Sequence, residues 1–505
     1  MKVLSELDLD PLESSQKSNS IVKSNIELSL LLRVSVVEVR QCLTLFREME
    51  KEYKAHVILL AYHGQGHINP MIQFSKRLAA KGIKITITST LSNTISMIKS
   101  ASTSIKFESI YNDHTEGGVA GPGGFKGFLD RFQSTGSINL RKLIKKYQVS
   151  EEMPVKCLVY DANIPWASNV ATEMGILRAA FFTQSCAFVA SCYPMNCELS
   201  GVAPSIPLLL MPGLPELRIP NLPSLGPEMG HFPPIIRFIL SQFDNSEKAD
   251  WVLFNSFNKL EEEVINWMSR LWPLRTIGPT LPSIYLDNRV KDDNDYSFNI
   301  HTPNTGDCMK WLDSKAMGSV VYVSFGSAAS LSAEQTAEVA KALVHSDKSF
   351  LWVVKPSEES ELPTNFTQEN SEQGLVVKWC PQLAVLAHNA VGCFVSHCGW
   401  NSTMEAISLG VPVVAMPQFL DQMTNAHFVE HIWQMGVEPK TDDKGFARSD
   451  EISSCIREIM HGQRGVEIKK NAVRWRAFAK EAIDEGGSSD KCIDEIVARL
   501  LVLGH

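Results

Sequence analysis

Residues 379–422 read WCPQLAVLAHNAVGCFVSHCGWNSTMEAISLGVPVVAMPQFLDQ, and this stretch decides how the chain is organised. Within it, VGCFVS at residues 391–396 is short and mostly apolar and precedes a glycine turn. Such a run is typical of a strand buried on both faces of a parallel sheet. Asn401 and Ser402 are good N-cap types, and residues 403–409 then predict a short helix. A strand, a turn and a helix start present free backbone N–H groups and a positive helix dipole, so the pattern predicts a phosphate site.

A second predicted strand at residues 412–416 brings an acid and an amide to the same edge. Asp421 and Gln422 follow this strand, and His397 follows the previous one. Ligands of open α/β sheets bind beyond the carboxyl ends of the strands, so these side chains should open onto one crevice. An acid beside an amide can hydrogen-bond adjacent sugar hydroxyls, and the histidine can add a donor to the phosphate site.

Three further side chains fit a nucleoside. Trp379 and Gln382 follow the preceding strand, where an indole can stack on a base and an amide can bind a ribose hydroxyl. Glu405, expected on the first turn of the short helix, can accept from a ribose hydroxyl too. Each residue alone would be an ordinary core or capping residue, but the whole spaced set favours a nucleotide-sugar pocket.

The stretch resembles the signature box of plant family 1 UDP-glycosyltransferases. It has the W-x-P-Q start, the H-C-G-W-N-S centre, the following Glu, the G-V-P and the closing D-Q, and it departs at Phe419, where many members carry Trp. The closing glutamine implies UDP-glucose as the donor. The residues that the resemblance implies are Trp379 for uracil; Gln382 and Glu405 for ribose; His397 and Ser402 for the diphosphate; and Trp400, Asp421 and Gln422 for the sugar; Cys380 and Asn401 belong to the same donor-binding set.

Size and composition indicate a globular protein with more than one domain. The chain has 505 residues, of which 44% are hydrophobic and 21% charged, so it can form two or more cores. A net charge of −8 argues against nucleic acid and anionic membranes as partners, because both require a basic surface. Eleven cysteines without metal-ligand spacing indicate buried thiols in a reducing compartment, so we expect a cytoplasmic protein without structural zinc.

Strand and helix patterns alternate in two series, which begin at residues 56–62 and 319–325. This alternation predicts α/β domains with doubly wound parallel sheets. No complete G-x-G-x-x-G or P-loop follows any strand, which weakens dehydrogenase and kinase interpretations. The resemblance covers the chain from about residue 54 and implies the GT-B architecture, two Rossmann-like domains facing a cleft.

The expected domain organisation follows from shifts in composition. Residues 1–48 are too charged to span a bilayer and lack the features of a secretory signal; an organelle transit peptide is the alternative to an unstructured extension. We expect a disordered N-terminal extension at residues 1–48, an acceptor-binding domain at 49–285, an exposed acidic linker at 286–306, a UDP-sugar-binding domain at 307–485 and a C-terminal helix at 486–505 that returns to the first domain.

Two histidines follow the first predicted strand, in YHGQGHINP at residues 62–70. His63 or His67 could act as a general base, and Pro70 suits the first turn of the next helix. Only His67 matches the catalytic histidine of the resembled family. Asp161 ends an apolar strand, so it should emerge at the same sheet edge, where a carboxylate would orient the imidazole and stabilise its cation; its alternative role is to cap the segment that follows.

These residues suggest a single in-line displacement. His67, oriented by Asp161, would deprotonate the acceptor, whose oxygen would then displace UDP from the anomeric carbon with inversion. Helix N-termini, His397 and Ser327, which lies in the turn after residues 319–325, would neutralise the diphosphate. The UDP-sugar is a substrate, and we expect neither a metal ion nor another cofactor.

The acceptor is predicted only as a class. By analogy with the resembled family it is a hydroxyl or carboxyl of a small hydrophobic plant metabolite, such as a phenolic, an aryl carboxylate or a terpenoid. Phe181, Phe182 and Phe188 could line its pocket, although core is the better prediction for most such residues. The expected partners are the acceptor and the UDP-sugar, with no nucleic acid and no membrane span, and the expected state is a monomer. The alternative function is a catalytically silent UDP-sugar-binding protein, which would need no base.

Overall fold

The structure is a computed structural model that describes residues 53–89, 105–110, 124–149, 153–200 and 234–502. From Lys54 onward the chain forms one compact unit. The predicted extension at residues 1–48 lies outside the described residues. Two parallel sheets with flanking helices confirm the predicted α/β architecture of two Rossmann-like domains.

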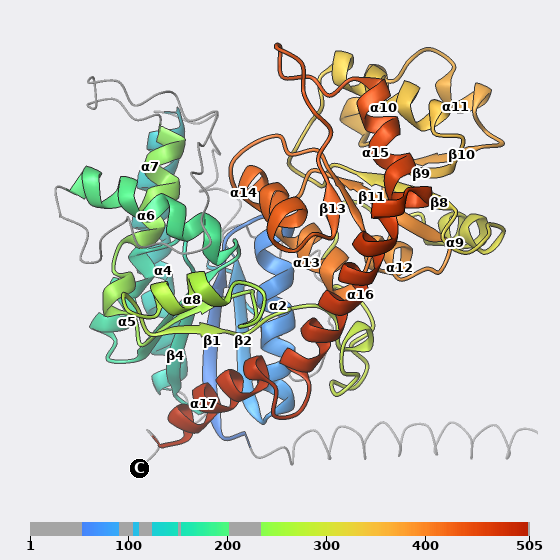
Figure 1. The fold of residues 1–505 in the computed structure, drawn as a ribbon. Coiled ribbons are helices and arrows are strands. Elements are labelled where there is room, and N and C mark those ends of the chain that lie inside the picture. Colours follow the sequence, from blue (N-terminus) through green and yellow to red (C-terminus); the bar gives the residue numbers. More distant parts are fainter. Residues whose placement is uncertain (1–52, 90–104, 111–123, 150–152, 201–233, 503–505) are drawn as a thin grey trace, which may run out of the picture. The chain divides into compact units, whose positions relative to one another are not determined.

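The first sheet has seven strands in the order β3-β2-β1-β4-β5-β6-β7, and every neighbouring pair is parallel. Its central strand β1 reads AHVILLA and is buried along its whole length, because both faces of the sheet are covered. Figure 1 shows α2 beside β1 and β2. The strands are β1 (Ala55–Ala61), β2 (Ile83–Ser89), β3 (Ile105–Phe107), β4 (Val155–Asp161), β5 (Leu177–Phe182), β6 (Trp251–Phe254) and β7 (Leu274–Thr276).

The second sheet has six parallel strands in the order β10-β9-β8-β11-β12-β13. β11 is the predicted strand with unchanged bounds, and all but its first residue are buried. The two-residue β13 and the three-residue β7 were not predicted, because strands this short carry no readable period. The strands are β8 (Val320–Ser324), β9 (Ser349–Val353), β10 (Gly374–Val377), β11 (Val391–Ser396), β12 (Val413–Ala415) and β13 (Gly436–Val437).

Helices cover both sheets. Phe181, Phe182 and Phe188 are 0–3% exposed, which confirms their prediction as core residues. The described α-helices are α2 (Gln65–Ala80), α4 (Gly124–Val149), α5 (Trp166–Glu173), α6 (Cys186–Ser200), α7 (Pro234–Leu240), α8 (Glu262–Met268), α9 (Thr305–Asp313), α10 (Ala333–His345), α11 (Phe366–Glu369), α12 (Gln382–Leu386), α13 (Trp400–Leu409), α14 (Asp421–His427), α15 (Ser449–His461), α16 (Gln463–Ile483) and α17 (Ser488–Val502).

Two predicted helix starts were wrong. α2 begins at Gln65, so Pro70 lies inside the helix and His67 lies in its first turn. α13 begins at Trp400 after Gly399, so Asn401 and Ser402 are helical residues and not N-caps. Glu405 consequently lies in the second turn of α13. In both cases a glycine ends the strand-to-helix turn, and the helix starts sooner than the polar side chains suggested.

The segment predicted as an exposed acidic linker is anchored to the first domain. Arg77 of α2 donates to both carboxylate oxygens of Asp287, at 2.9 and 3.1 Å, and Lys76 donates to Asp293 at 2.6 Å. All four side chains are at most 7% exposed. Much of the rest of this segment is exposed, but its acidic character is partly explained by buried ion pairs.

The C-terminal helix α17 contacts residues of the first sheet and its loops. Ser489 of α17 donates to the backbone carbonyl of Gly278 at 2.6 Å, and Glu495 and Arg499 form ion pairs with Arg275 and Asp250 at 2.8 and 2.6 Å. α16, in contrast, packs against α13 of the second domain. The last two helices, α16 and α17, therefore contact both domains.

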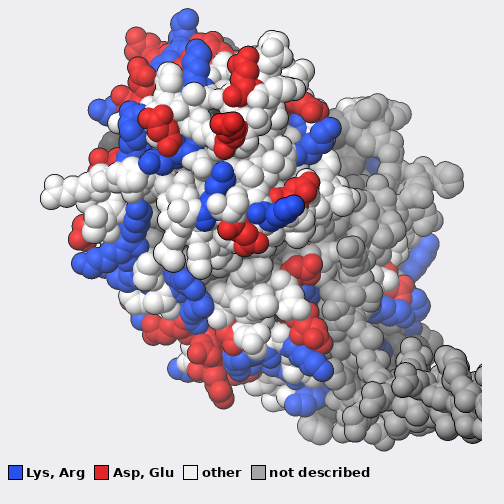
Figure 2. Space-filling view, turned by 90° about the vertical axis from the view of Figure 1, so that its right-hand side faces the viewer, with Lys and Arg blue, Asp and Glu red and all other residues white. Residues whose placement is uncertain are grey.

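Charges of both signs are mixed on the face in Figure 2, where Lys and Arg side chains stand among Asp and Glu. A mixed surface is not the electrostatic pattern of a nucleic-acid site. None of the helices in the described part of the chain is long and apolar enough to cross a membrane.

We predict that Asp287→Ala destabilises the protein by about 3 kcal/mol, because it leaves Arg77 buried without its carboxylate. Burial alone would raise the pKa of Asp287, but Arg77 outweighs this and lowers it. A carboxyl whose folded pKa is lowered stabilises the fold above its ordinary pKa, and this contribution is lost as pH falls through the folded pKa. Thermal unfolding should therefore show a lower midpoint for the variant at pH 7 and a smaller difference under acid conditions. Asp295→Ala, an exposed change in the same segment, is the control; an equal loss in both variants would contradict the role of the buried pair.

Candidate active site

Trp379 and Asp421 follow β10 and β12, but His67, Asp161 and His397 lie at the ends of the strands where the order of each sheet reverses. In the first sheet these strands are β1 and β4, and in the second β8 and β11. The crevice outside the carboxyl ends at such a point is where open α/β sheets bind ligands. His67 comes soon after β1, and Asp161 is the last residue of β4. His397 directly follows β11, and Gly326 lies in the turn after β8.

His67 is oriented by two neighbouring strand ends. Its Nδ1 lies 2.7 Å from Oδ2 of Asp161 and 3.2 Å from Oγ1 of Thr183, which follows β5. The other carboxylate oxygen of Asp161 accepts from the backbone N–H of Asn163 at 3.0 Å. The Asp161 side chain is 1% exposed, whereas that of His67 is 25% exposed. The carboxylate thus holds the proton on Nδ1 and leaves Nε2 as the acceptor.

The two neighbouring histidines have opposite pKa shifts. Burial lowers the pKa of His67, but Asp161 outweighs the burial, and with a further contribution from Asp421 the pKa is raised above 6.5. For His63, burial and repulsion from His67 lower the pKa to about 4. Asp421 belongs to the second domain, so its influence on His67 indicates that the two walls of the site are electrostatically coupled.

The turn after β11 fits closely around the imidazole of His397. A Cβ at Gly326 would lie 2.7 Å from the ring, and one at Gly399 would lie 2.5 Å from Nε2, so both positions require glycine. Cys398 adopts a φ of 60°, which is uncommon for a residue with a side chain. Burial and Lys355 lower the pKa of His397 to about 4. The imidazole is neutral at pH 7, and its buried Nδ1 has no hydrogen-bond partner in the described part of the chain.

A buried polar network fixes the predicted ribose residues. Tyr322 donates from its hydroxyl to Oε1 of Gln382 at 2.9 Å, which turns the amide nitrogen toward Glu405 and Ser402, at 2.6 and 2.9 Å. Burial raises the pKa of Glu405 to about 7. Cys380 lies within the same network, with its sulfur 3.3 Å from the Tyr322 hydroxyl.

The start of α14 holds the predicted sugar residues. Asp421 accepts from the side-chain amide of Asn425 at 2.9 Å and from the backbone N–H of Trp400. Burial raises its pKa to about 6. Oε1 of Gln422 accepts from the backbone N–H groups of Gln418 and Phe419, at 2.9 and 3.2 Å. This fixes the amide and leaves its nitrogen for another partner.

Several predicted donor residues also contact other elements. Trp400 is 3% exposed, and its indole N–H donates to the backbone carbonyl of Asn255 at 2.7 Å, so this N–H is not free for a sugar. Asn401 donates to the backbone carbonyl of Gly66 at 2.7 Å. The Trp379 ring meets the edge of His301, with 5.1 Å between ring centroids. Ser327 is exposed in the turn after β8.

Sequence reasoning missed Thr183, Tyr322 and Asn425. Thr183 directly follows the buried strand β5, a position that could have identified it, whereas Tyr322 lies in the middle of β8, where a buried tyrosine gives no such signal. Asn425 is one helical turn after Asp421, a spacing that brings side chains together. None of the three belongs to the motifs that identified the other residues.

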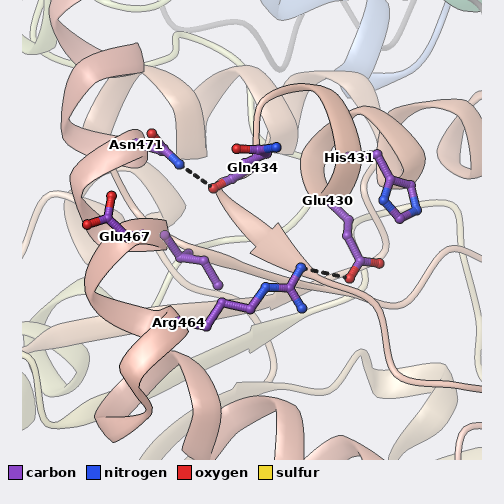
Figure 3. Close-up of a pocket in the computed structure, with 7 residues that line it drawn as sticks. Glu430, His431, Gln434, Arg464, Glu467 and Asn471 are labelled. Carbon is purple, nitrogen blue, oxygen red and sulfur yellow. Dashed lines mark hydrogen bonds and ion pairs between the residues drawn. The ribbon is translucent and has the colours of Figure 1, made fainter.

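A surface hollow of about 280 Å³ is a separate feature. Figure 3 shows it between the segment around Gln434 and α16, with Arg464 directed at Glu430 and Asn471 at the backbone of Gln434. None of the candidate site residues lines it. Because its main polar groups already pair with one another, the hollow is not the candidate site. Across the described residues, no group of three or more His, Cys, Asp or Glu side chains could hold a metal ion.

Comparison with known proteins gives consistent matches. A family model described as UDP-glucoronosyl and UDP-glucosyl transferase matches residues 236–478. The chain is 45% identical to a UDP-glucosyl transferase of Saponaria officinalis, over 89% of this chain and 98% of that protein. It is also 45% identical to Mogroside I-E synthase of Siraitia grosvenorii, over 88% of this chain and 98% of that protein. The crystal structure of Os79 from O. sativa in complex with UDP has a TM-score of 0.80 and 37% identity, over 88% of this chain and all of that chain.

We predict that Asp161→Asn lowers the pKa of His67 below its ordinary value. Burial then lowers the pKa of His67 without an opposing carboxylate. When the new amide oxygen accepts from the backbone N–H of Asn163, the amide nitrogen faces Nδ1 of His67 and forces the imidazole proton onto Nε2. NMR of isotope-labelled histidine, assigned with His67→Gln, reports both the titration and the tautomer. The His63 signal should stay lowered and is the internal control; an unchanged titration of His67 would mean that Asp161 does not determine its state.

Proposed function

The chain belongs to the plant family 1 UDP-glycosyltransferases and is a UDP-glucose-dependent glycosyltransferase, and from this premise we propose that it transfers glucose with inversion, using His67 as the general base and Asp161 as its partner. The observation that carries the proposal is the 2.7 Å contact between His67 Nδ1 and Asp161. A protein that only sensed a UDP-sugar would need no oriented base. The partly exposed imidazole keeps Nε2 available for an acceptor proton.

In the proposed reaction the proton moves from the acceptor to Nε2 of His67. The acceptor oxygen attacks the anomeric carbon of glucose on the side opposite UDP, the bond to the diphosphate oxygen breaks, and configuration inverts. Asp161 stabilises the imidazolium that forms. Burial would lower the pKa of His67, but the carboxylate of Asp161 raises it, so the imidazole is a stronger base than burial alone would leave.

The departing diphosphate is proposed to bind at the turn that follows β11. The first turn of the ten-residue α13 supplies backbone N–H groups and the positive end of the helix dipole. His397, which is neutral, adds a hydrogen bond without a titrating charge, and the turn containing Gly326 and Ser327 completes the site. This arrangement stabilises the charge that develops on the leaving group.

The nucleoside and the glucose of the donor are proposed to bind at the two polar networks described above. Uracil stacks on Trp379, and the ribose hydroxyls bind Gln382 and Glu405 in place of the contact that these two side chains make with each other. Glucose binds Asp421 and Gln422, whose orientations are fixed by Asn425 and by the backbone before α14.

The acceptor is proposed to be a small hydrophobic metabolite with a hydroxyl or carboxyl group. A cluster of aromatic rings begins beside the base: Tyr62 lies 5.3 Å from His67 and 5.5 Å from Phe238, centroid to centroid. Phe132 lies 6.2 Å from Tyr62. Rings of this kind favour a flat or bulky apolar body, with the reacting oxygen directed at His67. The relative named Mogroside I-E synthase supports an acceptor that is a small metabolite.

We predict that His67→Ala lowers kcat by about 10²–10⁴-fold, because the acceptor loses its base. The affinity for UDP should change less than about twofold, which is within the roughly 0.5 kcal/mol typical of a substitution away from the ligand. Initial rates with UDP-glucose and a panel of phenols, carboxylic acids and triterpenes give the first quantity, and calorimetry with UDP gives the second. His63→Ala is the matched control and should retain most of the rate. Retained turnover in His67→Ala, or its loss only in His63→Ala, would refute the assignment.

We predict that Gln422→His weakens the use of UDP-glucose by roughly tenfold in kcat/KM, about 1.4 kcal/mol, typical of a hydrogen bond lost from a buried site. Glutamine accepts two backbone N–H groups with its amide oxygen and keeps its amide nitrogen for the sugar, and an imidazole cannot make both sets of hydrogen bonds. Gln434→His, in the separate hollow, is the control, because it makes the same chemical change where no UDP-sugar is expected to bind. An unchanged donor profile in Gln422→His would count against its contact with glucose.

A further inference from the structure

Asn425 connects three parts of the active site through one buried side chain. It lies in α14 and is 0% exposed. Its amide nitrogen donates to Oδ2 of Asp421 and to the backbone carbonyl of Cys398, both at 2.9 Å. Its amide oxygen accepts from the hydroxyl of Ser185 at 2.9 Å. Both N–H donors and the oxygen are therefore used.

Only one orientation of this amide fits its surroundings. The nitrogen faces a carboxylate and a carbonyl, which are acceptors only, and the oxygen faces a hydroxyl that can donate. Rotation by half a turn would bring three oxygens together. The amide thus fixes Oδ2 of Asp421, and it also ties down the turn in which Cys398 has a positive φ.

Ser185 comes from the first domain and is itself rigidly held. It precedes α6, and its hydroxyl oxygen accepts from the backbone N–H of Phe188 at 3.2 Å, as an N-cap does. The buried Glu261 accepts from the next two backbone N–H groups, those of Cys186 and Ala187, at 3.2 and 2.8 Å. The donor of the Ser185 hydroxyl is therefore left for Asn425.

The same turn also reaches the general base. Thr183, two residues before Ser185, lies 3.2 Å from Nδ1 of His67. One short turn after β5 therefore contacts His67 through Thr183 and the support of Asp421 through Ser185. Displacement chemistry requires the reacting atoms to be brought to about 3–3.5 Å in line, so a shared support for the base and the sugar has a direct chemical use.

We propose that Asn425 is a positioning residue for the donor sugar, which holds the Asp421 carboxylate in its glucose-binding orientation, and that Ser185 ties this orientation to the turn that contacts His67. The proposal rests on the proposed function, because it takes Asp421 as a ligand of glucose. It adds a dependence of sugar binding on a side chain of the acceptor-binding domain.

The test compares the affinities for UDP-glucose and for UDP, measured by calorimetry without acceptor. Asn425→Asp keeps the shape of the side chain but places an oxygen against Asp421. It should lower the affinity for UDP-glucose at least tenfold more than the affinity for UDP. Asn425→Ala should show the same selectivity with a smaller ratio, because it removes the support without adding repulsion. Asn471→Asp, the same change beside the separate hollow, should leave both affinities unchanged.

Ser185 provides a second arm that does not alter α14. Ser185→Ala should lower the affinity for UDP-glucose about threefold more than the affinity for UDP. Ser185→Thr, which keeps the hydroxyl, should restore part of the lost affinity. Ser191→Ala is the matched control, because that hydroxyl donates to the carbonyl of Phe188 in its own helix. In the double variant Ser185→Ala with Asn425→Ala, the losses should be smaller than the product of the single losses, because the two side chains share one hydrogen bond.

The outcomes separate this proposal from the proposed function. Equal weakening of UDP and UDP-glucose in every variant would show a general structural role, and unchanged affinities would show no role; either result overturns the proposal. Thermal midpoints identify any variant that fails to fold, in which case the Ser185 variants decide. A wild-type protein that does not bind UDP-glucose would instead overturn the proposed function.

Discussion

The hydrogen bond between His67 and Asp161 depends on two strands that are neighbours in space although 94 residues separate the side chains. β1 and β4 are paired where the strand order of the first sheet reverses, so the segments that leave their carboxyl ends diverge and open a crevice. A carboxylate at the end of one strand and an imidazole just after the other can then meet without a dedicated loop. The apolar strands that form the core of the domain thus also align the proposed base.

The second domain uses the same geometry for a different chemistry. At its own point of reversal the strand ends carry glycine turns instead of an acid and a base, and the imidazole of His397 fits between two of these glycines. A side chain at either position would occupy the space that the ring needs. Burial keeps this imidazole neutral, whereas a carboxylate keeps His67 basic. Similar positions in two similar sheets therefore acquire opposite properties from their neighbours.

The sequence was sufficient for the architecture, and it also selected the candidate site residues, because both depend on local patterns. Apolar runs predicted the long strands, and the spaced residues from Trp379 to Gln422 predicted the donor wall. It failed where the outcome depended on tertiary partners. Nothing local shows that Asp287 would meet Arg77, 210 residues away, so the anchored linker was expected to be exposed. The indole N–H of Trp400 is likewise used by a carbonyl of the other domain.

Three hydrogen bonds between the two domains share a chemical feature that bears on the proposed choice of acceptor. Trp400, Asn401 and Trp433 of the second domain each donate from a side chain to a backbone carbonyl of the first, at 2.7, 2.7 and 3.0 Å. A backbone acceptor is present whatever side chain its residue carries. Side chains of the first domain, the proposed acceptor-binding domain, can therefore change without removing these three bonds. The bond from Ser185 to Asn425 is different, because there the first domain contributes a side chain. At that position the first domain cannot vary freely, since a change would act on the residue that supports Asp421.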